Sequence, residues 1–203
     1  MTNDSDLILD EKKINRALTR IAHEILESNP EPKSLVVIGI ITRGAILARR
    51  IARIIGELEG VKVPVGLMDI GLYRDDVHSK LDQPIVQRTE ILFDVVDKNV
   101  ILVDDVLFTG RTVRAALDQI VDFGRPRTIQ LAVLIDRGHR ELPIKADFVG
   151  VNIPTAKEDQ VVLHVKEKEG DEKVFIQRAG REAKAKSSGT KKPAKSKAKG
   201  GKK

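Results

Sequence analysis

The sequence predicts an α/β fold in which a parallel β-sheet carries helices on both faces. Short, continuously apolar runs with strand character alternate with amphipathic stretches of helical period along residues 1–180. Such strand–helix–strand repetition places consecutive strands parallel and packs the helices against the faces of the sheet. Any ligand site is then expected at the carboxyl ends of the strands.

The composition fits one folded domain and excludes several classes of site. The chain has 203 residues, of which 41% are hydrophobic, enough for one sizeable core. It has no cysteine, which excludes disulfides, a cysteine–zinc site and a thiol nucleophile. The longest apolar run, Leu35–Ile41, is too short for a membrane span, and the acidic start does not resemble a signal peptide. We therefore expect a soluble cytoplasmic protein without a membrane partner.

The charge is unevenly distributed along the chain. Residues 181–203 hold ten Lys or Arg and one acid and so contribute +9 to the formal charge of +6, which leaves −3 on residues 1–180. We predict a folded domain over 1–180 and a disordered Lys-rich tail over 181–203, because the tail has no large apolar residue to bury. The tail is either a solvated terminus or a weak, salt-sensitive nucleic-acid contact.

The first half of the domain is predicted as helix, strand, helix and strand. Asp10 is a candidate helix N-cap, and apolar residues follow it at helical spacing until Asn29-Pro30 ends the helix. A strand at Leu35–Ile41 is apolar throughout and therefore buried on both faces. A helix over 44–60 and a strand over 61–70 follow. Residues 71–90 are polar and predict a long loop, which is uncommon in a compact domain unless it is functional.

The second half continues the pattern. We predict a strand over 99–104, a turn, and a helix over 111–123 that Gly124 ends. A buried strand over 128–135 follows, and shorter strands are expected at 147–151, 161–165 and 173–177.

The most informative segment is the strand–turn–helix unit from Val100 to Thr112. It brings two adjacent carboxylates, Asp104 and Asp105, to the end of an apolar strand, and Thr109-Gly110-Arg111-Thr112 opens the next helix. The free N–H groups and positive dipole end of a helix N-terminus bind anions, and Gly110 permits close approach. Carboxylates suit ribose hydroxyls or a hydrated Mg²⁺. Each half alone is also common as a simple acid pair or a helix cap, but the two in one unit indicate a phosphate-bearing sugar.

This segment closely resembles the phosphoribosyl-diphosphate (PRPP) signature of type I phosphoribosyltransferases. Further segments resemble the PyrR family of bacterial pyrimidine-operon attenuators that are also uracil phosphoribosyltransferases. They include Asp-Arg-Gly-His-Arg-Glu-Leu-Pro at 136–143, much more specific than the signature alone. The other matching segments are 17–24, 42–44, 72–76, 110–114 and 152–155. The match covers roughly residues 7–180, where the family normally ends, so the Lys-rich tail departs from its pattern.

The resemblance implies the type I phosphoribosyltransferase fold with a small hood region, and it assigns a reaction. Uracil displaces pyrophosphate from PRPP to give UMP, with Mg²⁺ carried by PRPP rather than held by a dedicated protein site. Asp104 and Asp105 would hold the ribose hydroxyls, and Thr42 and Arg43 the pyrophosphate. The implied nucleotide contacts also include Val106, Leu107, Phe108, Thr109, Gly110, Arg111 and Thr112.

Three further groups of residues receive roles by resemblance. Arg137 and Val161 would contact the base, although a structural ion pair and core packing are the alternatives. Tyr73, Arg74 and Lys80 would belong to a lid over PRPP, formed by the 71–90 loop. The remaining group would bind pyr operon mRNA, namely Thr19, Arg20, His23, His139, Arg140 and Lys145.

The sequence is compatible with three hypotheses about function. The enzyme and the UMP-dependent transcription attenuator can coexist in one chain. A salvage enzyme without an RNA role is the second reading, and an RNA-binding regulator with vestigial catalysis is the third. His78 and His164 have no partner at ligand spacing, so we expect no zinc site. A homo-oligomer, dimeric or larger, is expected by family analogy.

Overall fold

The computed structural model describes residues 6–71 and 89–178, and its described strands form two sheets. The larger sheet is parallel with the order β3-β2-β4-β5-β6, and the smaller is antiparallel with the order β1-β8-β7. The strands are β1 (Leu7–Asp10), β2 (Leu35–Ile40), β3 (Val65–Met68), β4 (Asn99–Leu107), β5 (Thr128–Asp136), β6 (Phe148–Asn152), β7 (Gln160–His164) and β8 (Lys173–Gln177).

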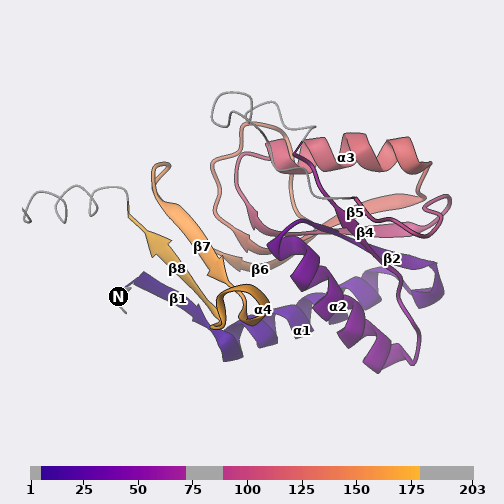
Figure 1. Ribbon diagram of the computed structural model, residues 1–203, viewed down its shortest axis with the longest axis horizontal. Helices are drawn as coiled ribbons and strands as arrows, with labels where there is room; N and C mark the ends of the chain where they lie inside the picture. Colours follow the sequence, from indigo (N-terminus) through magenta and orange to yellow (C-terminus); the bar gives the residue numbers. More distant parts are fainter. Residues whose placement is uncertain (1–5, 72–88, 179–203) are drawn as a thin grey trace, which may run out of the picture.

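Helices cover both faces of the parallel sheet, as predicted (Figure 1). Helices α1 (Glu11–Ser28) and α2 (Arg43–Glu59) lie on one face, and α3 (Arg111–Phe123) lies on the other. Two shorter elements, the 3₁₀ turn η2 (Pro32–Ser34) and the single turn α4 (Lys166–Glu169), complete the described chain.

The hydrophobic core has two parts, one on each side of the parallel sheet. The part under α3 includes Leu102 and Ile120. The part under α1 and α2 extends into the small sheet, because Leu163 and Val174 belong to the same buried cluster as Ile21. The small sheet is therefore attached to the main body by continuous apolar packing, which contributes stabilisation in proportion to the area buried.

Local sequence signals set the helix ends. The Asp10 carboxylate accepts a hydrogen bond from the Lys13 N–H at 2.8 Å, the contact expected of an N-cap. Asn29 ends α1, and its side-chain amide donates to the Ile25 carbonyl oxygen at 2.9 Å. Gly60 ends α2 with a φ of 65°, a left-handed conformation that glycine adopts without steric cost.

The strand order reverses between β2 and β4. The chain runs from β2 outward to β3 and then returns to pair β4 with the other side of β2. In an open parallel sheet, such a reversal leaves a crevice outside the carboxyl ends of the two strands. A ligand crevice is therefore expected between the segment that follows β2 and the segment that follows β4.

Several predicted boundaries were wrong. The strand expected over 61–70 is shorter, since Pro64 precedes its first residue, Val65. The strand expected over 99–104 continues to Leu107, so the two acidic residues lie within it. The strands expected at 161–165 and 173–177 form a separate antiparallel sheet with β1, which was not predicted. The expected lid residues and the tail lie outside the described residues, apart from the ends of the 71–90 loop, where Glu90 pairs with Leu67.

We expect Gly39→Ala to destabilise the fold. A Cβ at Gly39 would lie 2.5 Å from the Ala45 Cα atom and 2.7 Å from the Ala48 Cβ atom, so α2 would have to move off β2. Overpacking of this kind costs about 1–3 kcal/mol of unfolding free energy, measurable by urea denaturation. Arg49→Ala, at an exposed position of the same helix, should change it by no more than about 0.5 kcal/mol. Equal midpoints for Gly39→Ala and the unmutated chain would contradict the packing argument.

Candidate active site

The two carboxylates of β4 have different environments. Asp104 is buried, with 6% of its surface exposed, whereas Asp105 is half-buried. Each carboxylate accepts a hydrogen bond from the next backbone N–H, Asp104 from Asp105 at 2.9 Å and Asp105 from Val106 at 3.0 Å. These bonds orient both acids at the switch point of the sheet, where oxygen acceptors suit the hydroxyls of a sugar.

The segment after β2 meets the Asp104 backbone through a glycine. Gly44 is buried, and a Cβ there would lie 2.6 Å from the Val103 carbonyl oxygen and 3.4 Å from Asp104 Oδ1. Only a residue without a side chain permits this approach. The Thr42–Gly44 segment and the acidic end of β4, which were separate candidates in the sequence, are thus in contact.

Arg43, beside this contact, is directed toward the small sheet. Its Nη2 atom donates to Glu169 Oε1 on α4 at 2.7 Å. Its Nε atom is buried and has no hydrogen-bond partner among the described residues. The peptide bond between Ile41 and Thr42, just before it, is cis.

The turn between β4 and α3 has the form of an anion site. Gly110 is the N-cap of α3 with a φ of 93°, and it has no side chain to occupy the first-turn N–H groups. The Thr109 carbonyl oxygen accepts from the N–H groups of Glu141 and Leu142 at 3.0 and 3.1 Å. Arg111 extends to the same segment, because its Nε donates to Glu141 Oε2 at 2.8 Å. These contacts hold the turn in place. The Arg111 N–H makes a long hydrogen bond to Thr109 Oγ1 at 3.4 Å, and the N-terminus of α3 remains a candidate anion site.

Arg140 holds this turn in place through hydrogen bonds to backbone carbonyl oxygens. Its guanidinium donates to the carbonyl oxygens of Phe108 at 2.8 Å and of Ile144 at 2.9 Å, and it pairs with the Asp136 carboxylate. It also contacts the carbonyl oxygens of Leu107 and Gly138. Sequence reasoning assigned Arg140 to an RNA-binding face, but these contacts commit its guanidinium to the interior of the loop.

A hollow of about 420 Å³ lies at the carboxyl ends of β5 and β6. Arg137 in its lining is 6% exposed, and its guanidinium stacks on Phe108 at 4.1 Å from the ring centroid. It donates to Thr155 Oγ1 at 3.0 Å and to the Ala156 carbonyl oxygen at 2.7 Å. Burial lowers the pKa of Arg137, and the Asp159 charge acts against that shift.

Arg137 thus joins two segments that the resemblance assigned to the nucleotide. Phe108 belongs to the β4–α3 turn, and Thr155 and Ala156 belong to the connection that leads into β7 and Val161. The alternative of a simple ion pair does not describe Arg137, because backbone carbonyls and a ring are its main partners. Val161 is half-buried on β7, where it lies opposite Ile176 of β8.

The other expected RNA-binding residues lie on α1 and in the connection between β5 and the edge strand β6. Thr19, Arg20 and His23 are exposed on α1, and Arg20 donates to the β6 carbonyl oxygen of Val149 at 3.1 Å. Together with Asn15 and Arg16 they line a shallow surface hollow. Past the carboxyl end of β6, the exposed His139 ring contacts the Thr155 carbonyl oxygen at 2.7 Å. Lys145, just before β6, is also exposed.

Sequence reasoning missed the partners of several site residues. Thr155 lay within a segment noted for its resemblance, so that segment was the signal that could have found it. Glu169 lies in a run of alternating charges that is typical of a solvated loop, and nothing in the sequence indicates that it reaches Arg43.

No cluster of three potential metal ligands occurs among residues 6–71 and 89–178, and none of the helices there is long and apolar enough to cross a membrane.

Comparison with known proteins shows the family to which the chain belongs. The model of the phosphoribosyl transferase domain matches residues 4–168. The bifunctional protein PyrR of Deinococcus radiodurans is 57% identical over 176 residues, which cover 87% of this chain and 96% of that protein. The PyrR protein of Pelotomaculum thermopropionicum is 56% identical, with coverages of 87% and 97%.

Solved structures support the same fold at much lower sequence identity. A hypoxanthine-guanine phosphoribosyltransferase from Bacillus anthracis superimposes with a TM-score of 0.63 at 19% identity, covering 84% of this chain and 96% of that one. The likeness concerns the fold alone. The domain match, the close relatives and the shared architecture show that this chain belongs to the PyrR family of phosphoribosyltransferases.

Proposed function

We propose that the chain transfers the phosphoribosyl group of PRPP to uracil, giving UMP and pyrophosphate, and that UMP in the same site promotes binding to pyr mRNA. The observation that carries the proposal is the contact of Gly44 with Val103 and Asp104. It joins a pyrophosphate-binding segment to the acids and the helix N-terminus that suit the rest of PRPP. Relatives 57% identical to this chain carry the name bifunctional protein PyrR, which supports two activities in one chain.

The reaction requires positioning more than covalent chemistry by the protein. The bond between ribose C1 and the pyrophosphate oxygen breaks, the electron pair leaves with pyrophosphate, and N1 of uracil bonds to C1 and loses its proton. Bound to PRPP, Mg²⁺ would supply positive charge that neutralises the leaving pyrophosphate. Fixed donors and acceptors around the developing positive charge on the ribose lower the barrier because they need no reorganisation.

Each part of PRPP has a set of candidate partners in this chain. The N–H groups and hydroxyls of Thr109–Thr112 would hold the 5′-phosphate, and Asp104 and Asp105 would accept hydrogen bonds from the ribose hydroxyls. Thr42 and Arg43 would hold the pyrophosphate. Tyr73, Arg74 and Lys80 would cover PRPP and exclude water, which protects it from hydrolysis.

The hollow at the ends of β5 and β6 is the candidate site for uracil. Arg137 forms one side of it and holds the segment that leads to Val161, whose backbone would pair with the edge of the base. Because Arg137 is committed to carbonyl oxygens, we propose that it shapes the pocket rather than donating to the base from its guanidinium.

The RNA surface would run along both sides of β6. Thr19, Arg20 and His23 offer exposed donors on α1, and His139 and Lys145 offer them in the connection between β5 and β6. Arg140 would act there indirectly, by holding the loop that carries His139. Single-stranded bases of a hairpin loop are the features that such a surface reads. We further propose a domain over 1–180, a separate role for the tail over 181–203, and a homo-oligomeric assembly.

We predict that Asp105→Asn lowers kcat/KM for PRPP with uracil about 10- to 100-fold. A hydrogen bond to a charged acceptor contributes about 1.5–3 kcal/mol, which corresponds to that range. Turnover is measured by UMP formation from radiolabelled uracil. Asp118→Asn, which alters an exposed acid of α3 paired with Arg114, should leave the rate unchanged. Equal rates for Asp105→Asn and the unmutated chain would remove the ribose-binding role.

We predict that His23→Ala and Lys145→Ala each weaken binding of a pyr leader hairpin about tenfold in a gel shift with UMP. Each lost base or phosphate contact costs about 1–3 kcal/mol. Both side chains are exposed, so the changes should not disturb folding. The control is Arg53→Ala, which removes an exposed cation of α2 paired with Glu57. If the two variants and the control bind equally, the proposed face is wrong.

Removal of residues 181–203 tests the tail separately. If the tail adds only electrostatic affinity, its deletion should weaken binding equally for matched and scrambled hairpins. The loss should be large at 50 mM salt and small at 200 mM, because neutralised phosphates release counterions. Abolished discrimination between the two hairpins after deletion would instead assign sequence recognition to the tail.

A further inference from the structure

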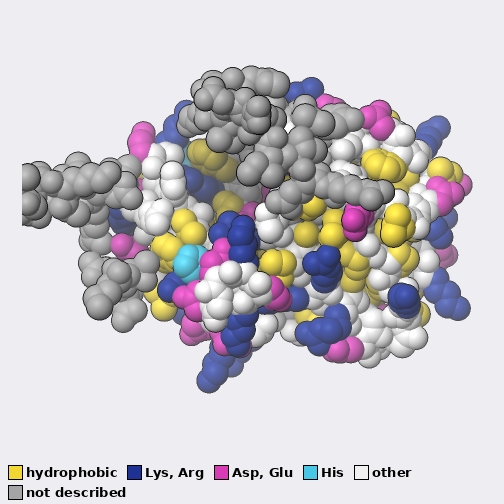
Figure 2. Space-filling model, in the orientation of Figure 1, with side chains coloured by type: hydrophobic (Ala, Val, Ile, Leu, Met, Phe, Trp, Pro, Cys, Tyr) yellow, Lys and Arg dark blue, Asp and Glu magenta, His cyan; other side chains and the backbone are white. Residues whose placement is uncertain are grey.

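The single turn α4 links the small sheet to the first turns of α2 through opposite charges. It lies between β7 and β8 and carries Glu167 and Glu169, while Arg43 and Arg50 lie one and a half to two turns apart on α2. Figure 2 shows Lys and Arg side chains interleaved with Asp and Glu side chains over this part of the molecule.

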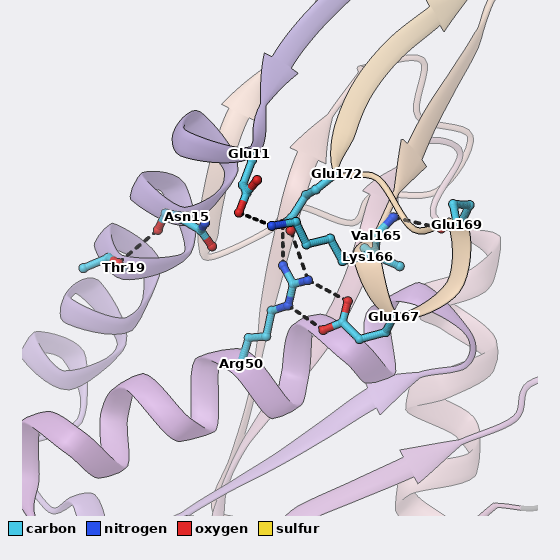
Figure 3. A network of polar contacts seen from close by, with 9 residues as sticks. All are labelled: Glu11, Asn15, Thr19, Arg50, Val165, Lys166, Glu167, Glu169 and Glu172. Atoms are coloured by element: carbon cyan, nitrogen blue, oxygen red, sulfur yellow. Dashed lines mark hydrogen bonds and ion pairs between the residues drawn. The ribbon is translucent and has the colours of Figure 1, made fainter.

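Arg50 of α2 binds two carboxylates, one on the turn α4 and one just after it. Its Nε and Nη2 donate to the two oxygens of Glu167 at 3.0 and 2.7 Å, and its Nη1 pairs with Glu172 (Figure 3). The Glu172 side chain is 2% exposed and that of Arg50 is 15% exposed. Burial acts to lower the pKa of Arg50, but the two carboxylates outweigh it and raise that pKa. The guanidinium is therefore a fixed, charged anchor for the turn.

Lys166, the first residue of the turn, adds a second attachment. Its ammonium group pairs with Glu11 at the start of α1, so the turn is held by two helices (Figure 3). Neither the Arg50 nor the Lys166 attachment involves Glu169 or Arg43.

Glu169 makes a different connection from the same turn. Its Oε2 accepts the Val165 N–H at 2.8 Å, and its Oε1 accepts from Arg43 Nη2 at 2.7 Å. Burial acts to raise the pKa of Glu169, but the Val165 N–H and the Arg43 charge outweigh it, so the pKa is lowered and the group is charged at neutral pH. The carboxylate thus joins a rigid turn to the first residue of α2, which belongs to the pyrophosphate-binding segment.

The geometry leaves Arg43 able to bind a second anion. A guanidinium carries five N–H donors, and Glu169 contacts one terminal nitrogen. The Arg43 side chain is 29% exposed, and its Nε is buried without a partner among residues 6–71 and 89–178. Part of the guanidinium is therefore exposed and not engaged by Glu169, and Arg43 directly precedes Gly44, which contacts the acidic end of β4.

We infer that Glu169 is a positioning residue for pyrophosphate binding, which holds the Arg43 guanidinium in place to meet the pyrophosphate group of PRPP. This inference rests on the proposed function. The alternative is that the ion pair only attaches the small sheet to α2. Arg50 and Lys166 already provide that attachment, so the contact with Arg43 is what distinguishes Glu169.

The test compares Glu169→Gln with Glu167→Gln in the full-length protein. Glu169→Gln keeps the shape and an acceptor for the Val165 N–H but removes the charge. We expect its KM for PRPP to rise about tenfold, with kcat and the KM for uracil changed less than twofold. Glu167→Gln removes a charge from the same turn without touching Arg43 and should leave the KM for PRPP unchanged. Glu169→Asp should recover part of the loss, and thermal unfolding of each variant monitors the fold.

A double-mutant cycle with Arg43→Ala gives the sharpest outcome. In that background Glu169→Gln should have no further effect on the KM for PRPP, because the residue it positions is gone. The inference is overturned if Glu169→Gln acts equally in both backgrounds, or if Glu167→Gln reproduces its effect. A lower KM in Glu169→Gln would also overturn it, since Glu169 would then compete with pyrophosphate.

Calorimetric titration with magnesium pyrophosphate separates this inference from the proposed function. If the unmutated protein fails to form UMP, the proposed function fails, but the titration still reports on the loop. Weaker binding of magnesium pyrophosphate by Glu169→Gln than by Glu167→Gln supports the positioning role, and equal binding by the two variants contradicts it.

Discussion

The close approach of α2 to β4 at Gly44 is the constraint on which the site depends. The parallel sheet places the carboxyl ends of β2 and β4 side by side, but a side chain at this position would push the two segments apart. The missing Cβ lets the residues after β2 reach the backbone of Val103 and Asp104. Two short segments that are about 60 residues apart in the sequence therefore act on one crevice.

Around this contact, one buried and two half-buried arginines hold loops in place. Arg140 fixes the β4–α3 turn, Arg137 joins that turn to the connection before β7, and Arg50 fixes α4 on α2. A guanidinium suits this role because it stays charged when buried and satisfies several carbonyl or carboxylate oxygens at once. Arg140 and Arg137 thereby hold the turn that carries the proposed backbone N–H donors. A site built in this way needs little reorganisation when a substrate binds.

Much of the fold and part of the site could be predicted from the sequence. The helix after Gly110 was predicted with the bounds observed, and Asp10 caps α1 as expected, because both depend on local chemistry. The antiparallel pairing of β7 and β8 was not predicted, because the sequence of a short strand does not indicate which sheet it joins. Local sequence patterns also do not predict where an arginine side chain points. Arg140 was interpreted as a surface charge, but its guanidinium donates to the carbonyl oxygen of Phe108, which is distant in the sequence. Glu169 was missed for the same reason, because its partner is 126 residues away.

A crystal structure of the protein with UMP and magnesium pyrophosphate bound together is the most direct test of the proposed site. We expect the UMP phosphate on the N–H groups of Thr109–Thr112, the ribose hydroxyls on Asp104 and Asp105, and pyrophosphate at Thr42 and Arg43. Both product molecules would then lie on opposite sides of the Gly44 contact. Density for either one at a different surface, with this crevice filled only by water, would contradict the account.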